Sequence, residues 1–78
     1  MVRYIRRKYL VMGKIRDGNK NYYLLNRHKT FETAEREALN IEKRFGRGTV
    51  AVLIGGDWRH KFYATYVTSP VLKKLRRL

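Results

Sequence analysis

The segment TFETAEREALNIEKRFG, residues 30–46, contains the clearest secondary-structure pattern of the chain, that of an amphipathic helix. Its apolar side chains recur at helical spacing and would form one stripe, made of Ala34, Ala38, Ile41 and Phe45. Thr33 is expected to cap the helix through its hydroxyl, with Glu35 and Glu37 in the first turn, where the helix dipole favours anions. Gly46 is expected to end the helix, because glycine readily adopts the left-handed conformation of a C-cap.

The residues before this helix predict a β-hairpin. Residues 3–15 and 21–27 are rich in β-branched and aromatic side chains, and Asp17-Gly18 lies between them. An Asp-Gly pair flanked by such runs is a strong hairpin signal, since the turn requires a positive φ that glycine adopts freely. We expect these two runs to be the first two strands of an antiparallel sheet.

The residues after the helix predict a second hairpin. Residues 49–54 are almost entirely apolar, as in a central strand, and Gly55-Gly56-Asp57 can form a tight turn before an alternating strand at 58–67. The predicted fold is therefore α+β, a two-layer ββαββ domain with one helix packed on a four-stranded antiparallel sheet formed from two hairpins. Nothing in the chain is expected to cover the other sheet face.

The length of 78 residues allows one small domain, which we place at residues 1–69. After Pro70, apolar and basic residues are interleaved, so residues 70–78 are expected to be a basic amphipathic C-terminal tail. Such a tail could form one or two helical turns, but a helix of that length is not stable alone in water.

The chain lacks the residues that several functional classes need. The chain has no cysteine, and His28 and His60 are its only imidazoles, with no carboxylate cluster beside them. Ser69 has no base at a suitable spacing, so we expect no enzyme, no metal site, no cofactor and no small-molecule substrate. The apolar run after the basic N-terminal residues is too short for a signal peptide or a membrane span. We therefore expect an intracellular protein of the cytoplasm or nucleoid, without a membrane partner.

The excess of positive charge predicts a polyanionic partner. Nineteen Lys and Arg oppose six Asp and Glu, which leaves a net charge of +13. Residues 1–31 carry +8 and residues 46–78 carry +6, whereas residues 32–45, the predicted helix, carry −1. A protein that inserts a helix into the major groove places its cations on that helix. We therefore expect the binding surface to be the sheet and both basic termini.

The candidate site residues combine cations for phosphate contacts with aromatic rings for base stacking. The candidates are Arg3, Arg6, Arg7, Lys8, Lys14, Arg16, Arg27, Trp58, Arg59, Lys61, Tyr63, Lys73, Lys74, Arg76 and Arg77. The other tyrosines of the predicted strands could either stack on bases or pack within the sheet, namely Tyr4, Tyr9, Tyr22, Tyr23 and Tyr66. The basic run at residues 3–8 could also protect an edge strand from aggregation.

Residues 30–38, TFETAEREA, resemble the start of the helix in the arm-type DNA-binding domains of phage integrases. In that family a three-stranded sheet, rather than the helix, enters the major groove, so the resemblance implies DNA binding by the sheet. It covers nine of the 78 residues. The second predicted hairpin departs from the layout of the arm domain, which puts membership of that family in doubt.

Together these features predict a nucleic-acid-binding protein, with DNA favoured over RNA, such as a small viral or plasmid regulator or a nucleoid-type protein. Its affinity would depend steeply on salt, because most contacts would be to phosphates. Two alternatives remain open: an interaction or inhibitor protein that docks its basic sheet on an acidic protein partner, and a ribonucleoprotein subunit whose ends order on RNA. A homodimer formed through the open sheet face or an edge strand is compatible with each of them.

Overall fold

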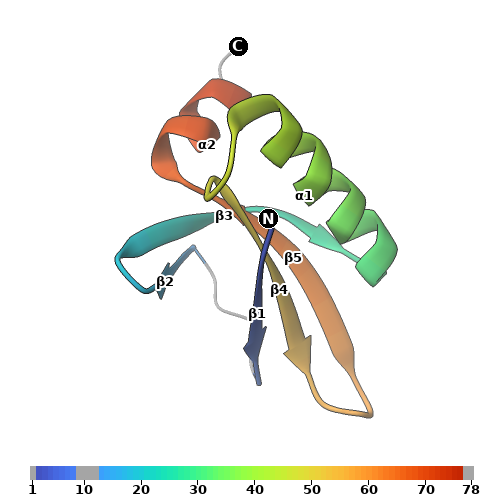
Figure 1. The fold of residues 1–78 in the computed structure, drawn as a ribbon. Helices are drawn as coiled ribbons and strands as arrows, with labels where there is room; N and C mark the ends of the chain where they lie inside the picture. Colours follow the sequence, from blue (N-terminus) through green and yellow to red (C-terminus); the bar gives the residue numbers. More distant parts are fainter. Residues whose placement is uncertain (1, 9–12, 77–78) are drawn as a thin grey trace.

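The computed structural model describes residues 2–8 and 13–76, which form five strands and two helices (Figure 1). In chain order these are β1 (Arg3–Arg7), β2 (Lys14–Asp17), β3 (Lys20–His28), α1 (Phe31–Phe45), β4 (Val50–Gly56), β5 (Lys61–Val67) and α2 (Ser69–Leu75). The predicted α+β class is confirmed. All five strands belong to one sheet in the order β1-β4-β5-β3-β2, and both helices pack on the same side of it.

The sheet is mixed, and the prediction of a four-stranded antiparallel sheet was wrong. That prediction treated residues 3–15 as one arm of a hairpin, but β2 alone pairs with β3, in a register from Asp17↔Lys20 to Lys14↔Tyr23. The four residues of β2 are enough to form this hairpin with β3, so the preceding strand β1 can pair with a different strand. It lies at the opposite edge of the sheet, parallel to β4, with Arg6 opposite Ile54.

Both predicted turns connect antiparallel strands. Gly18, after β2, has a φ of 62°, the positive value that an Asp-Gly hairpin signal anticipates. The second hairpin joins β4 and β5 in a register from Val50↔Val67 to Gly56↔Lys61. Its second strand is shorter than the predicted 58–67, because residues 57–60 form the connection and β5 begins at Lys61.

Helix α1 begins earlier than a cap at Thr33 would place it. Thr30 is the N-cap, and its side-chain oxygen accepts a hydrogen bond of 3.2 Å from the backbone N–H of Thr33. Glu32 is therefore the acidic residue of the first turn, in place of Glu35 and Glu37. The helix ends where predicted, at Gly46, which has a positive φ of 103°.

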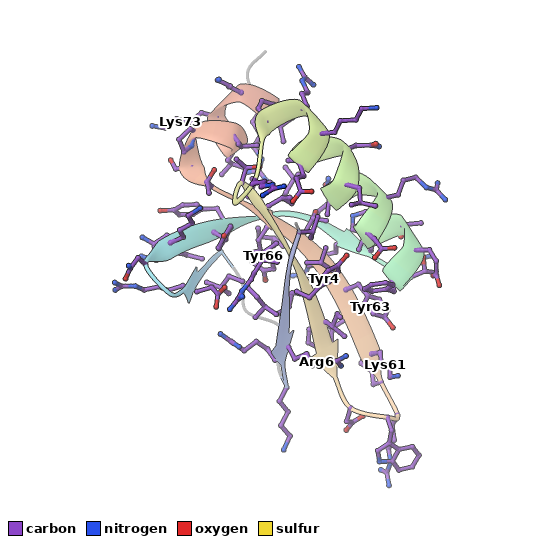
Figure 2. The ribbon with its side chains drawn as sticks, viewed as in Figure 1. Tyr4, Arg6, Lys61, Tyr63, Tyr66 and Lys73 are labelled. Carbon is purple, nitrogen blue, oxygen red and sulfur yellow. The ribbon has the colours of Figure 1, made fainter. Side chains whose placement is uncertain are left out.

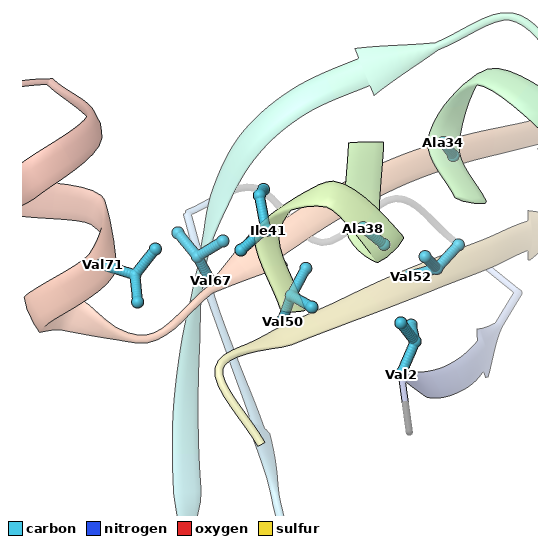
Figure 3. Close-up of a cluster of buried hydrophobic side chains, with 8 residues drawn as sticks. All are labelled: Val2, Ala34, Ala38, Ile41, Val50, Val52, Val67 and Val71. Carbon is cyan, nitrogen blue, oxygen red and sulfur yellow. The ribbon is translucent and has the colours of Figure 1, made fainter. Parts of the chain in front are cut away.

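The helices cover a first hydrophobic cluster (Figure 3). Its buried residues are Val2, Ala34, Ala38, Ile41, Val50, Val52, Val67 and Val71. The predicted stripe of α1 is thus confirmed, with Phe45 packed against the cluster from its edge. Val71 is the buried contribution of α2, the second helix that the predicted fold lacked. Its packing supplies the stabilisation that such a short helix cannot obtain alone.

The sheet face that was expected to be open carries a second hydrophobic cluster. Its buried residues come from all five strands: Ile5, Ile15, Tyr22, Ala51, Leu53, Ala64 and Tyr66. The sheet forms a half-barrel, so that these side chains cover one another. Arg3 on β1 forms an ion pair with Asp17 on β2, which links the two edge strands of the sheet. The sheet face that was expected to be uncovered therefore carries a second core.

Candidate nucleic-acid interface

The half of the sheet formed by β1, β4 and β5 extends past the first turn of α1 (Figure 1). At this end the strand register aligns Arg6 of β1 with Ile54 of β4, and Ile54 with Tyr63 of β5. Gly56 and Lys61 face each other two positions further along. Figure 2 shows the Arg6 and Lys61 side chains at this same end. The strand ends thus collect residues that are far apart in the sequence.

These strand ends line a shallow groove of about 580 Å³. Its walls are formed by Arg6, Arg7, Lys8, Phe31, Ile54, Gly55, Gly56, Lys61 and Tyr63. The cations are exposed, whereas the aromatic and aliphatic side chains are half-buried and form an apolar floor. The rings of Phe31 and Tyr63 meet edge to face, with centroids 6.1 Å apart, in the range that aromatic pairs prefer.

The turn between β4 and β5 adds two exposed residues beside this groove, Trp58 and Arg59. We use the name strand-end surface for the exposed cations of the groove together with these two residues. Its members are Arg6, Arg7, Lys8, Trp58, Arg59 and Lys61. The Arg59 guanidinium carbon lies 4.9 Å from the centroid of the Trp58 ring, a cation–π contact.

The carboxylate of Asp57, the one acidic residue of this turn, is hydrogen-bonded to the backbone. One of its carboxylate oxygens accepts hydrogen bonds from the backbone N–H groups of Arg59 at 2.8 Å and His60 at 3.0 Å. Asp57 is also the only acidic residue between positions 46 and 78. The five cations of the strand-end surface therefore outnumber the carboxylate of its own turn, a balance that attracts anions.

The remaining predicted cations lie elsewhere. Arg3 is paired with Asp17, while Lys14 and Arg16 lie on β2 at the other edge of the sheet, and Arg27 lies on β3. Lys73, Lys74 and Arg76 belong to α2 or follow it, and Figure 2 shows Lys73 at the opposite end of the molecule from Arg6 and Lys61. Arg77 lies outside the described residues. The structure thus separates the predicted cations into several surfaces.

Most of the candidate aromatic rings serve the fold. Tyr22 and Tyr66 are buried in the second cluster, and burial raises the pKa of the Tyr66 phenol. The Tyr4 hydroxyl donates a hydrogen bond of 2.8 Å to Glu35, which raises the pKa of Tyr4. Tyr63 is packed against Phe31, and Tyr9 lies outside the described residues. Trp58, which is 81% exposed, is the most exposed large hydrophobic residue of the described chain.

Phe31, Ile54, Gly55 and Gly56 line the groove although the sequence did not indicate them as part of a site, and Phe31 is the one aromatic ring among them. Its position at the start of α1 predicts packing at the helix end, and it does pack against the first cluster. Only the pairing of β1 with β4 brings the basic residues of β1 beside it. No local signal in the sequence specifies that long-range pairing.

A larger hollow, of about 640 Å³, lies between α1, α2 and β3; the Glu37 carboxylate is among its lining residues, whereas no Asp or Glu is among the described residues that line the strand-end groove. Arg76 donates a hydrogen bond of 3.3 Å to the backbone carbonyl of Leu24. Arg44 lies over the ring of Phe45, at 5.1 Å from its centroid. The strand-end surface therefore offers the better anion-binding site of the two.

The same hollow contains a carboxylate network that joins α1 to the sheet. Glu37 of α1 accepts hydrogen bonds from the Thr65 hydroxyl, from the Asn26 amide at 2.6 Å, and lies 3.0 Å from the His28 ring nitrogen. Burial alone would raise the pKa of Glu37, but the hydrogen bonds from Thr65, His28 and Asn26 outweigh it and lower that pKa. Each oxygen of Glu37 has a partner, which is typical of a structural carboxylate.

In comparisons with protein-family models, curated proteins and solved structures, no match was found for this chain. Within the described ranges, no group of three His, Asp or Glu side chains is placed to hold a metal ion. Neither of the two described helices is long and apolar enough to cross a membrane. Any function assigned to this chain therefore depends on its own residues, above all on the strand-end surface.

Proposed function

We propose that this protein binds nucleic acid through the strand-end surface, with phosphate contacts supplying most of the affinity. The observation that supports this most directly is the convergence of five cations, from the end of β1, the β4–β5 connection and the start of β5, beside an exposed indole. Lysine and arginine that neutralise phosphates release condensed counterions, which favours binding to any sequence. Of the two nucleic acids, DNA is kept as the one that the sequence analysis favours.

The exposure of these cations supports a binding role over a structural one. Arg3 shows the structural alternative, because its guanidinium is engaged by Asp17 across the sheet edges. Arg59 and Lys61, in contrast, lie exposed beyond the cores, and neither forms an ion pair with a carboxylate of the described residues. A net charge of +13 opposes compaction through self-repulsion, and a bound polyanion would relieve it.

The test compares two double variants that remove the same charge from opposite ends of the molecule. Arg59→Ala with Lys61→Ala alters the strand-end surface, and Lys73→Ala with Lys74→Ala alters α2. Binding to labelled DNA is measured by fluorescence anisotropy over a series of salt concentrations. The strand-end variant should reduce the steepness of log K against log salt by about 1.5, because each lost phosphate contact removes about 0.7–0.9.

The α2 variant should leave that slope close to the wild-type value. Equal losses in both double variants would mean that binding reflects net charge alone, and would refute a localised site. Weak binding to DNA and RNA that disappears equally for both near physiological salt would instead favour an acidic protein as the partner.

A further inference from the structure

The β4–β5 connection holds Trp58 in solvent, where the side chain contributes little to either core. It is the only tryptophan of the chain, and 81% of its surface is exposed. Neither hydrophobic cluster includes it. Large aromatic side chains are usually buried at least in part, and an exposed one in a charged surface is a common feature of binding sites.

The backbone that carries Trp58 is firmly held. Asp57 donates a backbone hydrogen bond of 3.0 Å to the carbonyl of His60, and its carboxylate accepts the two backbone N–H bonds described above. Gly56 has a φ of 90°, and a Cβ at that position would overlap the carbonyl oxygen of His60. Because the connection is already ordered, little conformational entropy remains to be lost when a ligand binds.

The neighbours of Trp58 fit a nucleotide. Arg59 lies over the indole and can at the same time reach a phosphate, since its other donors are free to point outward. Lys61 and the cations of β1 then follow along the groove edge and can contact further phosphates. An aromatic ring beside a line of cations is the combination found in proteins that bind single strands.

We propose that Trp58 stacks on an unpaired base, so that the preferred ligand of the strand-end surface is single-stranded nucleic acid. This inference rests on the proposed function and specifies its ligand. In a closed duplex both faces of each base are covered by neighbouring bases, so stacking on Trp58 would require unstacking first. In a single strand the bases are available, and any base can stack because each has a π-face.

A membrane surface is the other ligand that attracts tryptophan and cations, but the connection is poorly suited to it. Membrane binding by a surface element depends on a substantial apolar face. The residues around Trp58 are Asp57, Arg59 and His60, all polar and exposed. One indole offers enough apolar area for one base.

The intrinsic fluorescence of Trp58 provides the test, because no other tryptophan contributes to the signal. The full chain is titrated with a single-stranded DNA, a single-stranded RNA, a blunt DNA duplex of the same length, and vesicles of phosphatidylcholine with phosphatidylserine. We expect saturable quenching by the single strands and much less by the duplex. The variants without tryptophan give no such signal, so their binding is measured by the anisotropy of a labelled strand, alongside the wild type. Trp58→Ala should weaken single-strand binding about tenfold, and Trp58→Phe should recover part of that loss.

The slope of log K against log salt should stay unchanged in Trp58→Ala, because the indole carries no charge. Leu39→Ala is the matched control, since Leu39 is an exposed apolar side chain, at 49%, that lies on α1 and outside the strand-end surface. It should bind as the wild type does. Circular dichroism would establish that all three variants are folded.

Two kinds of failure can be told apart. If Trp58→Ala binds single strands as tightly as the wild type, or if the duplex quenches as strongly as the single strands, the stacking inference is wrong while the proposed function stands. If the wild type binds none of the nucleic acids, the proposed function is wrong and the inference fails with it. A blue shift of the Trp58 emission with the anionic vesicles, without any response to the nucleic acids, would identify a membrane ligand and would also overturn the inference.

Discussion

Replacing Glu37 with Gln should destabilise the protein, because Glu37 fastens α1 to the sheet. Its two carboxylate oxygens interact with the side chains of His28 and Asn26 on β3 and of Thr65 on β5. Gln keeps the shape of the side chain but loses the charge, and one of its two terminal groups becomes a donor. That donor would face another donor, so at least one of the three interactions is lost.

The size of the effect follows from the burial of the partners. Hydrogen bonds to charged groups contribute about 1.5–3 kcal/mol each. The Glu37 side chain is 27% exposed, so water screens part of this, whereas Thr65 is completely buried. We expect Glu37→Gln to lower the free energy of unfolding by about 2 kcal/mol, near the lower end of that range. In a domain of this size such a change lowers the melting temperature by roughly 10 °C.

The dependence on pH provides a second signature of the same interaction. The pKa of Glu37 is lower in the folded protein than its ordinary value, so the folded state favours the ionised carboxylate. Its contribution is therefore fully present above the pKa of the unfolded chain, about 4.5, and is lost as the pH falls through the lower folded value. The difference in stability between wild type and Glu37→Gln should accordingly shrink below about pH 4.5.

Urea unfolding followed by far-ultraviolet circular dichroism, near neutral pH and in acid, measures both effects. Glu35→Gln is the matched control, since it makes the same chemical change on α1, where Glu35 accepts one side-chain hydrogen bond within the described chain, from the exposed Tyr4 hydroxyl. It should cost less than about 1 kcal/mol. Equal costs for the two variants near neutral pH, or a Glu37→Gln cost that does not change in acid, would refute the proposed clamp.

Two further predictions concern the fold. Leu53→Ala should cost about 2–5 kcal/mol, as much as Ile41→Ala on the helix side, because Leu53 is fully buried in the second cluster; a near-neutral result in urea unfolding would mean that this sheet face is open. Gly56→Ala should cost about 1–3 kcal/mol, because its positive φ and its contact with the His60 carbonyl exclude a side chain. An unchanged melting temperature for Gly56→Ala would show that the connection tolerates another geometry.

The local elements of this fold were predictable because their signals are local. The stripe of α1 and the Asp-Gly turn each depend on residues within a few positions of one another. The pairing of β1 was not predictable in the same way. Residues 3–7 carry a strand pattern that is equally compatible with a hairpin partner or with a parallel partner, and the sequence separation between β1 and β4 gives no clue to the choice.

The second core could have been anticipated from β4. A strand in which Val50, Val52, Ala51 and Leu53 are all apolar has no solvent face, so both sides of the sheet had to be covered near it. The sequence does not show how the second side is covered, because the sheet covers it by curving on itself. The same curvature buries Tyr22 and Tyr66, which removes them from the set of exposed rings.

For the candidate site, the amino-acid composition indicated which kinds of residue to expect but not which of them lie together in the fold. Arg6 and Lys61 are 55 positions apart in the sequence, and only the order of the strands brings them to one end of the sheet. The basic residues of α2 carry the same charge pattern, yet they lie at the other end of the molecule. Nucleic-acid binding therefore remains a prediction for experiment, now attached to a defined surface.

The most direct measurement of that prediction is the salt dependence of binding by the wild-type protein. Anisotropy titrations with single-stranded DNA, duplex DNA and structured RNA, repeated from low to physiological salt, give the number of phosphates engaged. If all five cations of the strand-end surface contact phosphates, log K should fall against log salt with a slope of about −3.5 to −4.5. A slope near zero, or a slope that is the same after Arg59 and Lys61 are replaced by alanine, would contradict the assignment of this surface.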